Sequence, residues 1–283
     1  NEQTVLEQRR LERELFSAWC NWLCRNSLFK AQEEKKKVDF RNVAQKFEKE
    51  LQKNTSRWLS PISTENIEKP GAADVVFIPY IERMNASLAY YKGYSLREEH
   101  PYINTWLRNL EELNEYRGSQ GDFHTHAHDL PPQMGGCFTD INSNQQFFAQ
   151  KIDKGFGLGQ LELAEFLQDK KSKKAFIAIA VGRVIKHKER IIAVSPMKNT
   201  SFDQPLRAAL TSMISDKICP PDKKSASALR YLRDRVSVPR DMPLLSARFF
   251  RQALELTANI DSNDLGPEIP TRNRFDQDPM HFN

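Results

Sequence analysis

The chain has 283 residues, of which 39% are hydrophobic and 28% charged, and its formal net charge is +5. These proportions indicate a soluble globular protein, long enough for one large domain or two ordinary ones. No apolar run is long enough to cross a bilayer, which excludes a membrane-spanning helix. The four cysteines show no disulfide framework, so we expect a reducing compartment.

Two amphipathic helices are predicted at the start of the chain. Residues 2–26 place leucines and a tryptophan at helical spacing between charged residues, and residues 40–51 continue with phenylalanines and a leucine in the same spacing. Cys20 and Cys24 lie one turn apart in the first helix, and their tryptophan and leucine neighbours suggest burial. Residues 56–70 are rich in Ser, Thr, Asn and Pro, which predicts a loop.

A strong helix start follows this loop. Asp74 comes three residues after Gly71, so its carboxylate can reach back to the unpaired backbone N–H groups of the first turn. Because glycine has no hydroxyl, only half of a capping box is present, and we interpret Asp74 as a structural cap rather than a catalytic residue. The predicted helix covers residues 72–91 and contains Pro79, which should bend it. The next helix is expected over residues 101–113.

Glycines and prolines punctuate residues 117–136, which predicts a loop. Helical patterns resume over residues 160–167, 175–193, 204–218, 225–235 and 243–258. The segment 175–193 would also suit a strand, but its length and its alanines favour a helix. The polar, proline-containing segment 261–283 is expected to be a loose or partner-clasping tail.

Three histidines alternate in the predicted loop. If the segment is extended, His124, His126 and His128 share a face and could converge on one metal ion, whereas on a helix only His124 and His128 would do so. Asp129 or Cys137 could complete the shell, and a tetrapyrrole is an alternative ligand. The histidines could instead hydrogen-bond the backbone groups of the loop.

Residues 170–190 are locally basic, which indicates either a solvated helix face or a docking surface for an acidic partner or an anionic lipid surface. In the second case the chain would contact a membrane only peripherally. No aromatic-rich RNA motif or zinc-finger spacing accompanies the basic residues, so we expect no nucleic-acid partner.

Two segments carry a family resemblance. Residues 71–84 (GAADVVFIPYIERM) resemble the core helix of the glutathione transferase C-terminal domain, and residues 100–107 (HPYINTWL) resemble the helix that follows it. Where Gly71 stands, that family usually has Ser or Thr. Residues 116–137 (YRGSQGDFHTHAHDLPPQMGGC) and 238–242 (VPRDM) resemble a longer subgroup of transferase-like proteins found in cyanobacteria and plastids.

The resemblance covers residues 11–259 and implies an all-α fold. A glutathione transferase C-terminal-type helical bundle is expected over residues 1–116, a helical extension that begins with the His-rich loop over 117–260, and a tail over 261–283. It also implies a location in the plastid stroma, at the thylakoid surface or in the cyanobacterial cytoplasm, and a protein partner in a homo-oligomer or larger complex.

In the resembled family, an N-terminal thioredoxin-like domain binds and activates glutathione. The first fifty residues here have no βαβ pattern, so glutathione chemistry requires such a domain upstream of Asn1. The helical domain would then supply the wall of a hydrophobic co-substrate pocket through Trp19, Tyr80, Tyr90 and Tyr91, residues that core packing would also explain. The alternatives are a non-catalytic subunit of a photosynthetic protein complex and a metal- or pigment-binding module.

Overall fold

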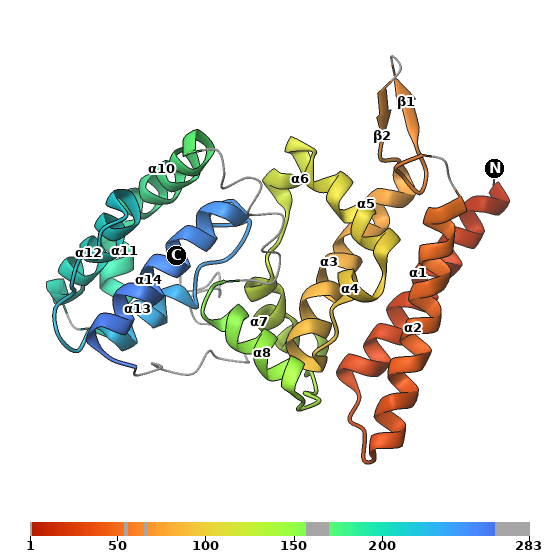
Figure 1. The fold of residues 1–283 in the computed structure, drawn as a ribbon, viewed down its shortest axis with the longest axis horizontal. Coiled ribbons are helices and arrows are strands. Elements are labelled where there is room, and N and C mark those ends of the chain that lie inside the picture. The colour runs from red at the N-terminus through yellow and green to blue at the C-terminus, as the bar shows by residue number, and fades with distance from the viewer. Residues whose placement is uncertain (1, 54–55, 65–66, 157–169, 198, 264–283) are drawn as a thin grey trace. The chain divides into compact units, whose positions relative to one another are not determined.

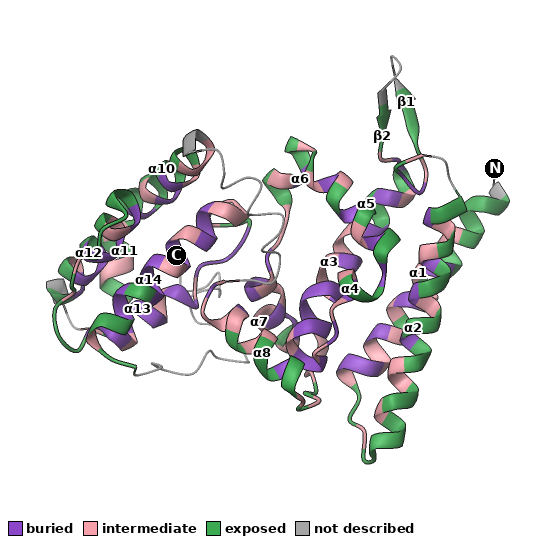
Figure 2. Cartoon of the chain, viewed as in Figure 1, coloured by how far each residue is buried: buried purple, intermediate pink, exposed green. Residues whose placement is uncertain are grey.

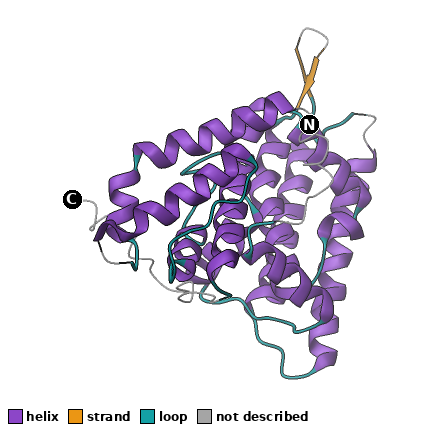
Figure 3. Cartoon of the chain, turned by 60° about the vertical axis from the view of Figure 1, so that its left-hand side comes forward, coloured by secondary structure: helices purple, strands orange, loops and turns teal. Residues whose placement is uncertain are grey.

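A computed structural model describes residues 2–53, 56–64, 67–156, 170–197 and 199–263. Over these residues the protein is built from helices, apart from one two-stranded sheet (Figure 3). The all-α expectation is therefore confirmed at the level of fold class. The chain divides into two compact units, which are described separately: the first contains Asn1–Tyr116 and Asp129–Ala149, and the second Arg117–His128 and Gln150–Asn283.

The first unit opens with an antiparallel helix pair, α1 (Glu2–Cys24) and α2 (Lys30–Lys53), which lie side by side (Figure 1). The apolar positions recognised in the sequence form their common face: Leu15, Trp19, Phe40 and Phe47 are buried, while the charged residues between them stay in solvent. The two predicted helices are thus present, and the second begins ten residues earlier than expected.

The segment predicted as a loop over residues 56–70 contains a short antiparallel hairpin. Strand β1 (Ile62–Thr64) pairs with β2 (Ile67–Lys69), with Ile62 opposite Lys69 (Figure 1). Each strand has only three residues, too few to show the alternating pattern by which strands are recognised in a sequence.

Four helices follow the hairpin: α3 (Ala72–Lys92), α4 (Leu96–Glu99), α5 (Pro101–Glu111) and α6 (Asn114–Ser119). Helix α3 begins and ends close to its predicted bounds, and it stops because Gly93 adopts the left-handed conformation (φ 65°) that closes helix C-termini. Helix α5 begins at Pro101, where a missing N–H costs no helical hydrogen bond.

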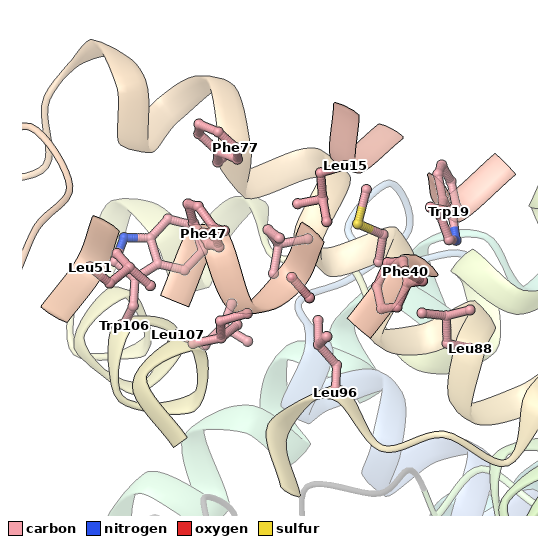
Figure 4. Close-up of a cluster of buried hydrophobic side chains, with 14 of the residues drawn as sticks. Leu15, Trp19, Phe40, Phe47, Leu51, Phe77, Leu88, Leu96, Trp106 and Leu107 are labelled. Carbon is pink, nitrogen blue, oxygen red and sulfur yellow. The ribbon is translucent and has the colours of Figure 1, made fainter. Parts of the chain in front are cut away.

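The core of the first unit collects aromatic rings from α1, α2, α3 and α5 (Figure 4). The rings of Phe47 and Phe77 stack with centroids 4.5 Å apart, and Trp106 meets Phe47 edge-on at 5.7 Å. Such pairs contribute about 0.5–1.5 kcal/mol beyond the burial of their apolar area. All four tryptophans of the chain, Trp19, Trp22, Trp58 and Trp106, are buried in this unit.

Two further helices, α7 (Phe123–Met134) and α8 (Ser143–Asp153), occupy the part of the chain where the two units alternate. The prediction of a loop over residues 117–136 is therefore wrong. Asp122 explains the helix, because its carboxylate accepts a hydrogen bond from Thr125 N (2.9 Å) and so caps the first turn of α7. The loop had been predicted from the glycines and prolines, but the helix includes Pro131 and Pro132 and ends before Gly135.

The second unit also contains α10 (Lys170–Lys186), α11 (Lys188–Val194), the 3₁₀ turn η1 (Asn199–Phe202), α12 (Asp203–Ser215), α13 (Ala226–Arg233) and α14 (Leu244–Asp261). Helix α14 is central to it, since α10, α12 and α13 all pack on α14. These elements confirm four predicted helical segments, with a break at residue 187. The helix predicted at 160–167 and most of the tail lie outside the described residues.

The basic stretch is largely exposed, as both a solvated face and a docking surface require. On α10 and α11, Lys174, Arg183, Lys186 and Arg190 are exposed, while Ala180 is buried. Exposed and buried stretches alternate along α10 (Figure 2). Two other lysines of the stretch make ion pairs, Lys173 with Asp216 and Lys188 with Asp203. None of the helices described here combines the length and the apolar character needed to traverse a bilayer.

Candidate functional sites

Asp74 is buried at the start of α3 and accepts hydrogen bonds from three separate segments. Its carboxylate accepts hydrogen bonds from the backbone N–H groups of Leu59 (2.8 Å) and Ser60 (2.9 Å) in the preceding loop, and from that of Gly71 (3.1 Å) at the start of its own helix. It also accepts the indole N–H of Trp106 on α5, at 2.7 Å. The side chain is therefore a structural hub, with every contact suited to holding segments together.

The cap that Gly71 lacks comes from another residue. The hydroxyl of Ser60 accepts the Ala73 N–H at 3.1 Å and donates to Asp74 Oδ2 at 3.2 Å, which completes the capping box from outside the helix. This arrangement also explains the glycine, because a Cβ at position 71 would lie 1.8 Å from the Ser60 carbonyl oxygen. A serine or threonine at position 71 would displace Ser60, whose hydroxyl already caps the helix.

The aromatic residues predicted to line a co-substrate pocket belong to or border the core of the first unit. Trp19 is buried and donates its indole N–H to Ser87 Oγ (3.0 Å), and Tyr91 is buried as well. Tyr80 and Tyr90 are half-buried and pack against the core from its edge. Of the four, these two have the exposure that contact with a ligand requires.

The histidine segment lies on helix α7, so the three histidines do not share a face. His124 and His128, one turn apart, have ring centroids 4.6 Å apart. His126 is on another side of the helix, where its imidazole packs over Gly121 so closely that a Cβ at 121 would lie 2.2 Å from Nε2. The prediction that all three histidines converge is wrong, since it required an extended chain, and the helical alternative holds.

A carboxylate that sequence reasoning missed completes this group. Asp153, at the end of α8, has Oδ1 2.8 Å from His128 Nε2, and one donor atom from each of His124, His128 and Asp153 lies within 4.8 Å of the other two. The partners suggested from the sequence, Asp129 and Cys137, are not in the group. Asp153 follows His128 by 25 residues, a separation that no motif spacing in the sequence marks.

His124 is surrounded by buried charge. Its Nε2 lies 3.4 Å from Asp234 Oδ1, and burial together with the Arg251 guanidinium holds the pKa of His124 well below its usual range. Asp122 pairs with Arg251, and although burial opposes this, the guanidinium lowers the pKa of Asp122 to about 2. The lowered pKa of His124 favours the neutral imidazole, the form that coordinates metals.

A buried ionic cluster joins α13 to α14. Glu255 accepts Arg230 Nε at 3.1 Å and Arg233 Nη1 at 2.5 Å, and Arg233 also pairs with Asp234 at 2.6 Å. Sequence reasoning missed it, although one signal was present: Arg251 and Glu255 fall among the apolar residues of α14 at helical spacing. Ions this deeply buried must be paired, and in this cluster each of the four side chains has an oppositely charged partner.

Two thiols meet in the first unit. A hydrogen bond from Phe138 N to the Leu23 carbonyl (2.8 Å) ties the segment after α7 to the end of α1, and the Cys24 and Cys137 thiols share a hydrogen bond beside it. That hydrogen bond lowers the pKa of Cys24, with burial opposing the shift and the nearby Lys92 adding to it. The same hydrogen bond raises the pKa of Cys137, with burial adding to the shift and Lys92 opposing it. Burial raises the pKa of Cys20 to about 11.

Comparison of the chain with protein-family models, with curated proteins and with solved structures gives no match.

Proposed function

We propose that the chain is the helical part of a glutathione transferase-like protein. The resemblance noted in the sequence motivates this proposal, and the contacts of Asp74 carry it. In the resembled family, the acidic residue near the start of the core helix is a folding signal, and here Asp74 joins the start of α3 to Trp106 on α5, the two helices on which the resemblance rests. The order of the helices from α1 to α5 is also the order that the resemblance implies.

In this proposal the two ligands bind to different domains, and the accessible side chains indicate which ligand the described helices contact. Binding and activation of glutathione would belong to a thioredoxin-like domain in the complete gene product. The described helices would form one wall of a pocket for an apolar co-substrate, with the half-buried Tyr80 and Tyr90 in contact with it. Trp19 and Tyr91 would support this wall from the core. A plastid or cyanobacterial location belongs to the same proposal.

Calorimetric titration with glutathione tests the proposal on this chain beside the full-length gene product. We expect binding by the longer protein alone. In that protein, Tyr80→Ala and Tyr90→Ala should raise the KM for an apolar electrophilic co-substrate and leave glutathione binding unchanged, because the two ligands would contact different domains. Tyr102→Ala, a change at an exposed tyrosine of α5, is the matched control. If neither protein binds glutathione, the proposal is wrong.

An interaction role is the second candidate, and one surface of the second unit favours it. Ile218 and Leu256 are 81% and 59% exposed, and they border a hollow of about 320 Å³ between α10, α12 and α14. Exposed apolar side chains gathered around a hollow are typical of protein interfaces. The occupant that we test is a second copy of the chain: light scattering should report a dimer, and Leu256→Lys should convert it to a monomer. A wild-type monomer would exclude self-association through this surface.

A further inference from the structure

We propose that His124, His128 and Asp153 together bind one divalent first-row transition-metal ion. This site lies wholly within the second unit and goes beyond the transferase-like function proposed above. Two imidazoles and one carboxylate are the donor set of many zinc and non-haem iron centres, which keep their remaining positions for water or substrate. Four observations support the assignment.

The first observation is the spacing of the donor atoms. Helix α7 presents His124 and His128 from the same side because the two residues are one turn apart, and the end of α8 brings Asp153 to them. The three donor atoms lie within 4.8 Å of one another. In a tetrahedral zinc site with bonds of about 2.0–2.2 Å, donor atoms are roughly 3.4 Å apart. Small side-chain rotations therefore suffice to close the shell.

The second observation is an unsatisfied nitrogen. The His124 side chain is 3% exposed, and its Nε2 has no hydrogen bond, although Asp234 Oδ1 is 3.4 Å away. A buried polar atom without a partner costs about 1–3 kcal/mol, so such atoms call for an explanation. A metal ion coordinated by His124 would bind the lone pair of one of its ring nitrogens. The positive charge of the ion would then lie close to the Asp234 carboxylate.

The third observation is space and access. A cavity of about 10 Å³ beside His124 is lined by Asp122, Arg248 and Arg251 among others, and not by His128 or Asp153. This volume suits one water molecule next to the donor group and not a tetrapyrrole. The Asp153 side chain is 38% exposed while His124 is buried, so an ion can enter from the Asp153 side.

The fourth observation is the local charge. Three buried arginines near the site, Arg230, Arg233 and Arg251, are matched by three buried carboxylates, which are Asp122, Asp234 and Glu255. Arg248, which lines the cavity, and Asp153 add one charge of each sign. These opposite charges balance, so the surrounding side chains carry no net positive charge that would repel a cation. Because they carry no net negative charge either, we expect micromolar rather than nanomolar affinity.

Cobalt(II) is the probe for the experiment, since its visible absorption reports the coordination geometry, and zinc(II) calorimetry gives the stoichiometry. The full chain is prepared without a polyhistidine tag and treated with a chelator beforehand. We expect one ion per chain and d–d bands typical of nitrogen and oxygen ligands. His128→Gln and Asp153→Asn should each weaken binding by at least about tenfold.

His126→Gln is the matched control, because His126 lies on the same helix outside the donor group, and it should bind like the wild type. Circular dichroism shows whether each variant is folded; if His128→Gln is not, the more exposed Asp153→Asn decides. A Cys24→Ser, Cys137→Ser double variant should also bind normally, which excludes the thiols as ligands. Absence of cobalt binding, equal binding by the wild type and Asp153→Asn, or loss of binding in the thiol variant would overturn the proposal.

Discussion

Replacement of Asp74 tests whether one buried carboxylate holds the first unit together. In Asp74→Ala, the N–H groups of Leu59 and Gly71 and the indole N–H of Trp106 lose their acceptor in a buried environment. Each unsatisfied buried donor costs about 1–3 kcal/mol, and local relaxation recovers part of the sum. We expect the free energy of unfolding to fall by about 3–5 kcal/mol, at the high end of single substitutions.

Asp74→Asn separates hydrogen bonding from shape. Its one remaining oxygen can still accept from Leu59 N and the Trp106 indole, which both bond Oδ1, while its amide NH₂ group faces the donors of Ser60 and Gly71. We expect a loss of about 2–4 kcal/mol, because two donors lose their acceptor and meet another donor instead.

Tryptophan fluorescence during urea unfolding is the suitable assay, because all four tryptophans are in the first unit and the signal reports that unit. Asp39→Asn, at an exposed carboxylate on α2, is the control and should change stability by less than about 0.5 kcal/mol. If Asp74→Ala costs less than about 1 kcal/mol with an unchanged slope, the carboxylate is not the hub that its contacts indicate.

Three further results are expected. Gly71→Ala should destabilise the first unit by about 1–3 kcal/mol in urea unfolding, because the new Cβ meets a carbonyl oxygen of the preceding loop; a neutral effect would contradict this. Cys24 should be alkylated by iodoacetamide before Cys137 at pH 8, as measured by peptide mass spectrometry, and Cys137→Ala should slow its reaction. Burial raises the pKa of Glu33, but hydrogen bonds, led by the one from Lys92, outweigh burial and hold the pKa below 4.5. The ionised Glu33 should therefore contribute its full stabilisation of the fold above pH 4.5, and this contribution should be lost as the pH falls. In urea unfolding at a series of pH values, Glu33→Gln should make the free energy of unfolding depend less on pH.

The parts of the fold that were predicted correctly have a local cause. Helices α1 and α14 show apolar residues at helical spacing, and the starts of α3 and α5 are marked by Asp74 and Pro101, whose effects act within one turn. Such signals depend on neighbouring residues alone and can be read without tertiary structure.

The parts that were missed depend on distant residues. Helix α7 contains residues that usually mark loops, and it is stabilised by the burial of Asp122 against Arg251, which is 129 residues away. The hydroxyl that completes the cap of α3 comes from Ser60, and the carboxylate beside His128 comes from Asp153. Sequence patterns identified the histidines and the correct helical alternative for them, but only the folded chain shows which carboxylate joins them.

The two aspartates at helix starts have different partners, and this difference decides what each can reveal. Asp74 binds neutral N–H donors, so its loss leaves unsatisfied hydrogen bonds. Asp122 pairs with the buried Arg251, so its loss would leave a charge in the protein interior, which costs more than losing a neutral hydrogen bond. Because Asp122 also caps the helix that carries His124, the start of α7 and the metal site should be lost together. Asp122→Ala should therefore weaken cobalt binding although residue 122 is not one of the three proposed ligands, and unchanged cobalt binding by a folded Asp122→Ala chain would show that α7 holds its histidines without this cap and ion pair.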